Sequence, residues 1–314
     1  MMRTILSLVA ALMFGCSQEQ SPPPPTDEAP PTTEVQPLVA PPVTVANSFR
    51  HMLRSEAIGQ DFVIDVSLPY VMSDAPMPVV YVTDGNLMFP IIANTARLLQ
   101  LGGELPPMIV VGIGYAVDST TEILALRTRD LTPTLDAAFV ERSSEGPMPL
   151  PKSIQPGGAA VFLDFIEGEV KPLIEANYRV KTTDATLVGD SLGGLFTLYA
   201  LFNRTEEYQR YLVGSPSLWW DERTLFNDEA AYAGNAEDLD VDLFLSVGTL
   251  EEDPANADDW AKMVSNTQAM ARLLEDRSYP NLRMTTIVFD NETHLSVVPA
   301  TFSRGLREVF ADDV

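Results

Sequence analysis

The sequence predicts an α/β fold with a mainly parallel central β-sheet and helices on both of its faces. Apolar segments of strand length alternate along the chain with segments of helical periodicity, an order typical of a parallel sheet. Most of the apolar segments are nearly continuous, as expected for strands that are covered on both faces. Apolar residues make up 46% of the 314 residues and charged residues 20%, which is enough for a large core.

Six segments are expected to be strands. They are residues 62–68, 78–83, 108–112, 185–189, 243–247 and 284–289. The first alternates apolar and polar residues and therefore predicts a half-exposed strand, whereas the others predict central strands. Since no helical pattern separates the first two segments, we expect the opening strands to form an antiparallel hairpin at one edge of the sheet.

Five segments are expected to be helices. They are residues 91–100, 161–176, 192–203, 259–274 and 297–310. In the fourth, residues that recur every three or four positions predict one buried face, namely Trp260, Met263, Thr267, Met270 and Leu274. Residues 116–157 and 215–240 are expected to be long connections of the kind that form the walls of a binding site.

Residues 1–16 have the features of an export signal. A positive charge precedes an apolar run over residues 5–14, which is long enough for a signal peptide and too short to span a bilayer. The run ends at Gly15-Cys16 and resembles the cleavage box of bacterial lipoproteins, in which the cysteine becomes the lipidated N-terminus. We therefore expect a lipoprotein signal peptide, with an ordinary secretory signal as the alternative. An aspartate directly after the lipidated cysteine retains some lipoproteins at the inner membrane, but residue 17 is a serine. The periplasmic side of the outer membrane is therefore the expected location.

Residues 17–46 differ in composition from the rest of the chain. Proline is frequent, large apolar residues are scarce, and such a segment cannot bury enough surface to fold. We expect a disordered, Pro-rich tether between the lipid anchor and a catalytic domain over residues 47–314. The membrane is thus an expected partner, through the N-terminal anchor.

Composition excludes several classes of function. Acidic residues outnumber basic residues 44 to 20, and the formal charge of −24 would repel a phosphate backbone, so nucleic-acid binding is not expected. One cysteine excludes an internal disulfide and a thiolate cluster, and two histidines are too few for most histidine-rich metal sites. We therefore expect neither a metal nor an organic cofactor. A catalytic imidazole can belong only to His51 or His294.

The segment Gly189-Asp190-Ser191-Leu192-Gly193 matches the pattern G-x-S-x-G. It follows an expected strand and precedes an expected helix. This is the setting of a nucleophile elbow, where glycines permit a tight strand-to-helix turn. Ser191 is therefore the expected nucleophile, and the alternative is a glycine-rich turn with a structural serine.

A nucleophile elbow predicts the chain order nucleophile, acid, histidine. His294 is the only histidine after Ser191 and follows an expected strand, whereas His51 precedes the core of the sheet and is expected to be structural. The acid is expected after the strand at residues 243–247. Three candidates follow one another there, and the residues leave all of them open: Glu251, Glu252 and Asp253.

Acyl transfer also needs two backbone donors for the developing oxyanion. One is expected to be the N–H of Leu192, directly after the nucleophile, and the other lies after the strand at residues 78–83. Asn86 is the favoured second donor and Gly85 the alternative, although Asp84-Gly85 is also an ordinary turn signal.

Four further residues on the long connections are expected to bind substrate. They are Arg127, Asp130, Trp219 and Trp220. Indole rings suit flat aromatic groups, and an arginine can hold a carbonyl or phenolate oxygen. The alternative is that both tryptophans pack in the core and that Arg127 and Asp130 form an internal ion pair.

Taken together, these motifs resemble the α/β-hydrolase putative-esterase family, which includes feruloyl esterases, S-formylglutathione hydrolase and siderophore esterases. The resemblance spans about residues 50–310 and is closest to the periplasmic enterobactin and salmochelin trilactone esterases. The matching segments are Tyr81-Val82-Thr83-Asp84-Gly85-Asn86, Gly112-Ile113-Gly114-Tyr115, Arg127-Thr128-Arg129-Asp130-Leu131-Thr132-Pro133, Gly189-Asp190-Ser191-Leu192-Gly193-Gly194, Ser215-Pro216-Ser217-Leu218-Trp219-Trp220, Ser246-Val247-Gly248-Thr249-Leu250-Glu251 and Thr293-His294.

The resemblance implies an α/β-hydrolase fold and a serine carboxylic-ester hydrolase that works through an acyl-enzyme. It favours Glu251 as the acid, because this family has a glutamate three positions after the glycine; a Ser–His dyad stays an alternative. The expected partner is a small-molecule ester, such as a siderophore or aromatic ester. The alternatives are an acyltransferase on the same fold and a non-catalytic lipoprotein that binds in the cell envelope.

Overall fold

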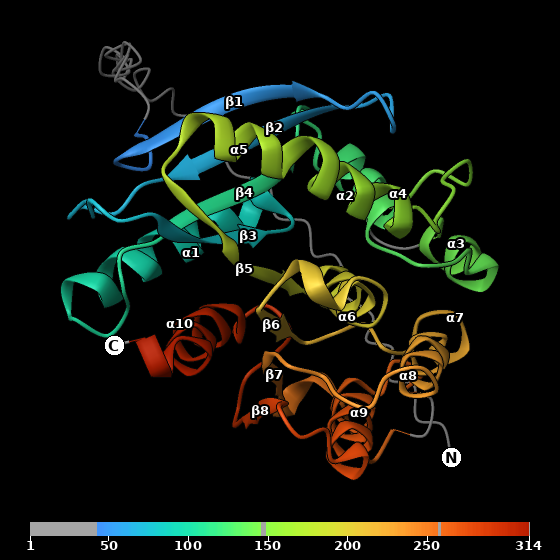
Figure 1. Cartoon of the computed structure of the whole chain (residues 1–314). Helices are drawn as coiled ribbons and strands as arrows, with labels where there is room; N and C mark the ends of the chain where they lie inside the picture. The colour runs from blue at the N-terminus through green and yellow to red at the C-terminus, as the bar shows by residue number, and fades with distance from the viewer. Residues whose placement is uncertain (1–42, 146–148, 257–258, 314) are drawn as a thin grey trace, which may run out of the picture. The chain divides into compact units, whose positions relative to one another are not determined.

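The structure is a computed structural model that describes residues 43–145, 149–256 and 259–313. One sheet runs through the compact unit Thr44–Val314, with the strand order β1-β2-β4-β3-β5-β6-β7-β8 (Figure 1). The strands are β1 (Ser48–Arg54), β2 (Asp61–Ser67), β3 (Met77–Val82), β4 (Ile109–Tyr115), β5 (Val180–Asp190), β6 (Arg210–Gly214), β7 (Asp242–Gly248) and β8 (Arg283–Phe289).

The six strands from β3 to β8 are parallel, which confirms the predicted mainly parallel sheet. The antiparallel hairpin lies at the edge, as expected, but β1 and β2 form it, and β2 then pairs antiparallel with β4. The predicted pairing of residues 62–68 with 78–83 is wrong, because β3 lies between β4 and β5. Strand β1 escaped prediction since its exposed, charged residues include Arg50, which pairs with Asp65 of β2 at 2.7 Å.

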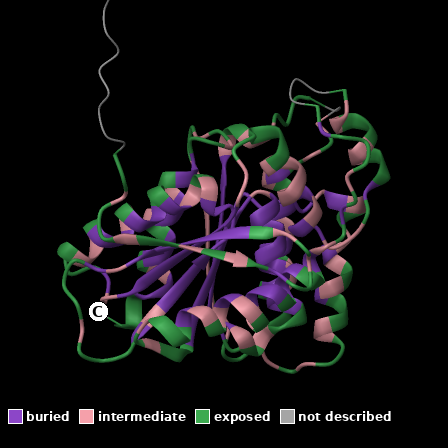
Figure 2. Cartoon of the chain, turned by 90° about the horizontal axis from the view of Figure 1, so that it is seen from above, coloured by how far each residue is buried: buried purple, intermediate pink, exposed green. Residues whose placement is uncertain are grey.

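Helices cover both faces of the sheet, and their outer sides are exposed (Figures 1 and 2). On one face, α1 and α10 enclose a cluster that includes Phe89, Phe302 and Phe244. On the other, α4, α6, α8 and α9 enclose a larger cluster. The helices are α1 (Gly85–Leu101), α2 (Thr120–Asp130), α3 (Ala137–Ser143), α4 (Ala159–Phe165), α5 (Lys171–Asn177), α6 (Leu192–Asn203), α7 (Trp220–Arg223), α8 (Leu225–Ala233), α9 (Met263–Arg277) and α10 (Val298–Val309).

The predicted helix over residues 161–176 exists as α4 and α5, joined by a π-helical turn at Ile166–Val170. The two predicted long connections contain short helices instead. Ser119 and Asp136 cap the N-termini of α2 and α3, because their side chains accept hydrogen bonds from backbone N–H groups of the first turn. These helices were missed because they are short and weakly apolar.

The predicted start of the helix at residue 259 is wrong, since α9 begins at Met263. Trp260 therefore lies outside the helix, and its side chain is exposed rather than part of the buried face. The other four predicted positions of that face, from Met263 to Leu274, are buried. Among the residues that the structure describes, no helix has the length and apolar character needed to cross a membrane.

Candidate active site

Ser191 lies in a sharp turn between β5 and α6, with φ 62° and ψ −119°. A non-glycine residue rarely adopts such a backbone conformation, and its presence is typical of a functional site. The glycines two positions before and two positions after Ser191 leave no room for a side chain. A Cβ at Gly189 would collide with Gly193, and a Cβ at Gly193 would lie 2.5 Å from Oγ1 of Thr83. The turn therefore presents Ser191 at the N-terminus of α6, at the carboxyl edge of the parallel strands.

A continuous chain of hydrogen bonds leads from Ser191 through His294 to Glu251. Nε2 of His294 lies 3.0 Å from Oγ of Ser191, and Nδ1 lies 2.6 Å from Oε2 of Glu251. The histidine is in the loop between β8 and α10, and the glutamate is in the short turn after β7. The structure thus brings together three residues that are far apart in the sequence, in the order predicted from it.

The other carboxylate oxygen of Glu251 also accepts hydrogen bonds. Oε1 accepts hydrogen bonds of 2.6 Å from the hydroxyl of Ser215 and from the N–H of Gly248, and the side chain is only 1% exposed. The neighbouring carboxylate of Glu252 instead accepts from the N–H and hydroxyl of Ser265, and that of Asp253 from the N–H of Ala255. Of the three candidate acids, Glu251 is the one that contacts the imidazole.

The electrostatic surroundings raise the pKa of His294 above the usual value of an imidazole. Burial disfavours the imidazolium, but the hydrogen bond to Glu251 and the negative charges of Asp190 and Glu251 outweigh it. Burial also raises the pKa of Asp190, beside the nucleophile, to about 7. Within the described ranges, Oδ1 of Asp190 is buried without a hydrogen-bond partner. A role for Asp190 was not predicted, although its position next to Ser191 in the motif was the available signal.

The candidate oxyanion donors lie at two helix N-termini, where the first N–H groups have no acceptor within the helix. Leu192 begins α6, and Gly85 and Asn86 begin α1. The side chain of Asn86 is fixed to the end of β4, because its Nδ2 donates to Tyr115 O and its Oδ1 accepts from Tyr115 N–H. A Cβ at Gly85 would lie 2.7 Å from backbone atoms of β4, so a glycine is needed for this close approach.

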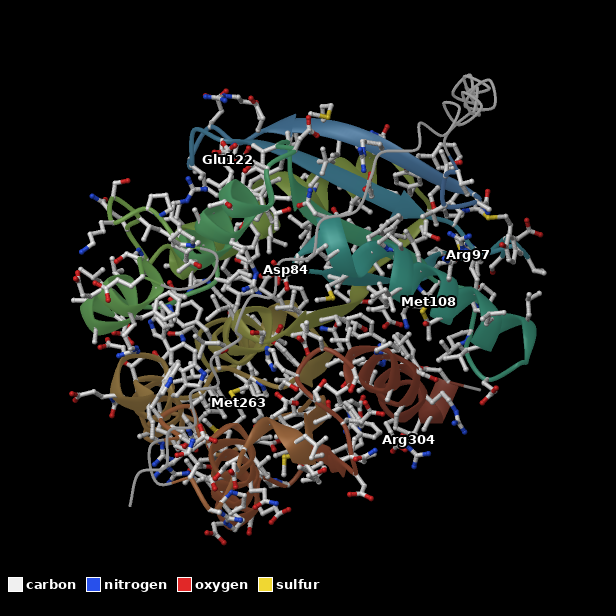
Figure 3. All side chains as sticks on the ribbon, turned by 180° about the vertical axis from the view of Figure 1, so that it is seen from behind. Asp84, Arg97, Met108, Glu122, Met263 and Arg304 are labelled. Atoms are coloured by element: carbon white, nitrogen blue, oxygen red, sulfur yellow. The ribbon has the colours of Figure 1, made fainter. Side chains whose placement is uncertain are left out.

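Arg127 and Asp84 form a bidentate salt bridge next to the turn that carries these donors. Nε and Nη2 of Arg127 donate to the two carboxylate oxygens of Asp84 at 2.8 Å, and the side chains are 14% and 4% exposed. Asp84 precedes α1 in a left-handed conformation, with φ 54°, and Figure 3 shows it at that end of the helix. The pair therefore fixes the turn that carries Gly85 and Asn86.

Two of the predicted substrate contacts are wrong. Asp130 is buried and pairs with Arg129 at 2.7 Å, so it neither faces substrate nor pairs with Arg127 as the alternative proposed. Trp220 is completely buried, because α3 packs over it through Phe139. Its indole N–H donates to Thr134 O.

His51, which is expected to be structural, lies on β1, and its Nε2 is 2.6 Å from the hydroxyl of Tyr178.

Trp219 is partly exposed and lines a cavity of about 640 Å³, here called the indole cavity. Its lining residues are Trp219, Glu222, Arg223, Asp259, Trp260, Lys262 and Asn266. All of these except Trp219 were missed as site residues. Trp260 could have been found, because a tryptophan beside a run of acidic residues suggests a loop rather than a buried helix face.

One family of known proteins matches most of this chain. The family described as "Putative esterase" matches residues 55–290. The chain belongs to this family. It is a serine esterase with an α/β-hydrolase fold.

Two relatives match most of the chain. The siderophore triacetylfusarinine C esterase of Aspergillus fumigatus is 29% identical over 86% of this chain and 96% of its own length. The ferri-bacillibactin esterase BesA of Bacillus subtilis is 29% identical over 84% of this chain and 90% of its own length. Both are named as esterases of siderophores.

Two solved structures share the fold closely. The BES protein from Bacillus cereus has a TM-score of 0.71 and 30% identity over 86% of this chain and 98% of that one. The IroE-like serine hydrolase from Shewanella oneidensis has a TM-score of 0.71 and 27% identity over 85% of this chain and 81% of that one.

Proposed function

We propose that this enzyme hydrolyses siderophore esters with a Ser191–His294–Glu251 triad and an acyl-enzyme intermediate. The observation that carries the proposal is the unbroken chain of hydrogen bonds from the serine hydroxyl to the buried carboxylate. A serine hydroxyl is a weak nucleophile until an adjacent base removes its proton, and His294 is within reach to do so. Glu251 holds the imidazole with Nδ1 protonated and stabilises the imidazolium that forms.

The first half of the reaction forms the acyl-enzyme. Oγ of Ser191 attacks the ester carbonyl carbon while Nε2 of His294 takes the hydroxyl proton. The carbonyl oxygen becomes an oxyanion, for which the N–H of Leu192 and that of Asn86 or Gly85 are the candidate donors. When the C–O bond of the ester breaks, His294 returns the proton to the leaving alcohol.

The second half releases the acid. A water molecule attacks the acyl carbonyl, His294 takes its proton, and the bond to Ser191 breaks with return of that proton to Oγ. An acyltransferase would place another alcohol where this water acts. Release of free acid in plain buffer therefore supports the hydrolase, whereas turnover that requires an added sugar or alcohol supports the transferase.

The substrate class rests on the relatives together with the site. Two proteins that match this chain over nearly their whole length are named as siderophore esterases. The test is a panel of ester siderophores and simple nitrophenyl esters, assayed with the full chain and with Ser191→Ala. We expect siderophore esters to give the higher kcat/KM, and the variant to hydrolyse none of the panel. Turnover of nitrophenyl esters alone would contradict the substrate class.

We further propose that the enzyme is an exported lipoprotein, anchored through Cys16 and held at the periplasmic side of the outer membrane. Cys16 and the Pro-rich segment up to residue 42 lie outside the described residues. The proposal is supported by the apolar run that ends at Gly15-Cys16. Anchoring would leave the catalytic unit facing the compartment that an imported siderophore enters.

A further inference from the structure

A further cavity lies near the end of α1 that is distant from the candidate active site. Its volume is about 250 Å³, and it is here called the Arg97 cavity. Helix α1 begins at the candidate oxyanion donors and rises about 1.5 Å per residue, so Arg97 lies roughly 18 Å along the helix from Gly85. Figure 3 shows Arg97 towards the other end of α1 from Asp84. Two polar residues and five of largely apolar surface line this cavity: Arg97, Gln100, Tyr70, Val71, Leu101, Leu105 and Pro107.

Arg97 is a buried cation that contacts neutral groups. It is only 2% exposed, and its Nε and Nη2 donate to the hydroxyls of Ser67 and Ser48 at 2.6–3.0 Å. A buried charge is usually paired with an opposite charge, as the buried Arg210 is with Asp184. No carboxylate is among the described residues that line the Arg97 cavity. The positive charge of Arg97 is therefore left for a ligand to neutralise.

Two buried polar atoms of the lining have no hydrogen-bond partner within residues 43–145, 149–256 and 259–313. They are Nη1 of Arg97 and Oε1 of Gln100. A buried donor or acceptor without a partner costs the free energy of its lost hydration, so both atoms favour a ligand that pairs with them. The two residues are three positions apart on α1, and side chains at this spacing lie on the same face of a helix. The cavity thus offers a charged donor and a neutral acceptor on one face of α1.

The rest of the lining favours hydrocarbon. The ring of Tyr70 lies 5.3 Å from Cζ of Arg97, and Leu105 is buried. Tyr70, Val71 and Leu101 are exposed, so this part of the lining is open to solvent. The cavity is smaller than the range of about 300–1,000 Å³ that is typical of sites for drug-sized ligands. A ligand that fits it is therefore small, with an apolar body beside its charged group.

From these observations we propose that the Arg97 cavity binds a small 2-hydroxycarboxylate with an apolar body. The carboxylate accepts from Nη1 of Arg97, the hydroxyl donates to Oε1 of Gln100, and the hydrocarbon lies against Tyr70 and Leu105. The chain's charge of −24 does not prevent this, because charges beyond about 8 Å are largely screened at physiological ionic strength. The site lies apart from the triad and goes beyond the proposed ester hydrolysis.

The test measures the Kd of three small ligands for the full chain by isothermal titration calorimetry. We expect mandelate, a phenyl-substituted 2-hydroxycarboxylate, to bind with a Kd of roughly 0.1–1 mM. Phenylacetate lacks the hydroxyl and should bind about three- to tenfold more weakly. 1-Phenylethane-1,2-diol has an uncharged group in place of the carboxylate and should bind about 10- to 100-fold more weakly. A diol that binds as tightly as mandelate would overturn the proposal.

Variants of α1 locate the binding site. Arg97→Gln should raise the Kd of mandelate about 10- to 100-fold, but it also removes bonds to two serines and can destabilise the fold. Gln100→Leu keeps Arg97 and gives the deciding comparison. It should weaken mandelate about three- to tenfold and leave phenylacetate, which has no hydroxyl, unchanged. Leu98→Ala is the matched control, because Leu98 is exposed on the same turn and does not line the cavity. An equal effect of Gln100→Leu on both ligands, or none, would contradict the assignment.

Binding at the catalytic site is distinguished by competition. Mandelate should not inhibit hydrolysis of nitrophenyl acetate competitively, and its Kd should stay the same after the protein is treated with a fluorophosphonate. Competitive inhibition, or absence of binding up to about 10 mM, would overturn the proposal. The calorimetry does not depend on turnover, so a failure of the proposed ester hydrolysis leaves this result interpretable.

Discussion

The hydroxyl of Ser215 donates a 2.6 Å hydrogen bond to Oε1 of Glu251, which leaves Oε2 for His294. Ser215 itself is completely buried and has φ 37°, a conformation held by its N–H bond to Ser246 O. The end of β6 thus orients the acid that follows β7. The proposed triad is thus supported by a fourth residue, which the nucleophile motif gives no reason to expect.

Removing this hydroxyl should weaken catalysis without abolishing it. Ser215→Ala leaves Glu251 with one donor fewer, and a hydrogen bond to a charged group contributes about 1.5–3 kcal/mol. We expect kcat for nitrophenyl acetate to fall roughly 10- to 100-fold. Ser217→Ala is the matched control, because this neighbour is also buried and donates its backbone N–H, which the substitution keeps, to Ser191 O. A similar loss in both variants would show that packing, rather than the bond to Glu251, is responsible.

The neighbouring acids should differ sharply in importance. Glu251→Gln keeps the size of the side chain but removes the charge that stabilises the imidazolium of His294, and we expect a loss of at least 100-fold in kcat. Glu252→Gln should stay within a few-fold of wild type, because its carboxylate contacts Ser265 instead. Steady-state kinetics on nitrophenyl acetate measures both. Equal, mild losses would indicate that a Ser–His dyad suffices.

Asp190 should shift the pH dependence of the reaction. His294 acts as a base only when neutral, so activity falls as pH drops through its pKa, which the negative charge of Asp190 helps to raise. Asp190→Asn removes that charge, so the pKa of His294 decreases and the acidic limb of the kcat/KM profile should move to lower pH. Glu252→Gln serves as the control. An unmoved limb, or one displaced to higher pH, would show that Asp190 does not act through His294.

The N-terminal proposal is tested independently of the chemistry. Cys16→Ser removes the atom that would carry lipid, so the variant should leave the membrane fraction or fail to mature. Two or more acyl chains hold a protein stably at a membrane, and the variant would carry none of them on residue 16. Fractionation with mass analysis of the N-terminal peptide is the measurement. Wild-type protein that is recovered in the soluble fraction with an unmodified N-terminal region would contradict the assignment.

The sequence was sufficient to predict that Ser191 and His294 belong to one candidate site. Ser191 lies in a motif with a defined strand-to-helix setting, and the scarcity of histidine left one candidate downstream. Glu251 was favoured by family resemblance, but its contact with His294 depends on how the turn after β7 orients three adjacent carboxylates. Local pattern does not encode that orientation.

The incorrect predictions for the partner of Arg127 and for Trp220 also have physical causes. Arg127 pairs with Asp84, a residue 43 positions earlier, and no local periodicity predicts a contact at that distance. Trp219 and Trp220 are neighbours that both contact Phe139 of α3, yet Trp220 is completely buried, whereas Trp219 is only partly buried and lines the indole cavity. The burial of a side chain in a short, weakly apolar segment depends on elements distant in the sequence.

The central claim is that Ser191 is the nucleophile of an ester hydrolase. The most direct measurement is the intact mass of wild type and Ser191→Ala after treatment with a fluorophosphonate, together with hydrolysis of an ester siderophore. The account predicts one adduct on Ser191 of the wild type, no adduct on the variant, and a loss of about 10⁶-fold in kcat, as when another serine hydrolase loses its nucleophile. Labelling or hydrolysis that persists in a folded Ser191→Ala protein would contradict it.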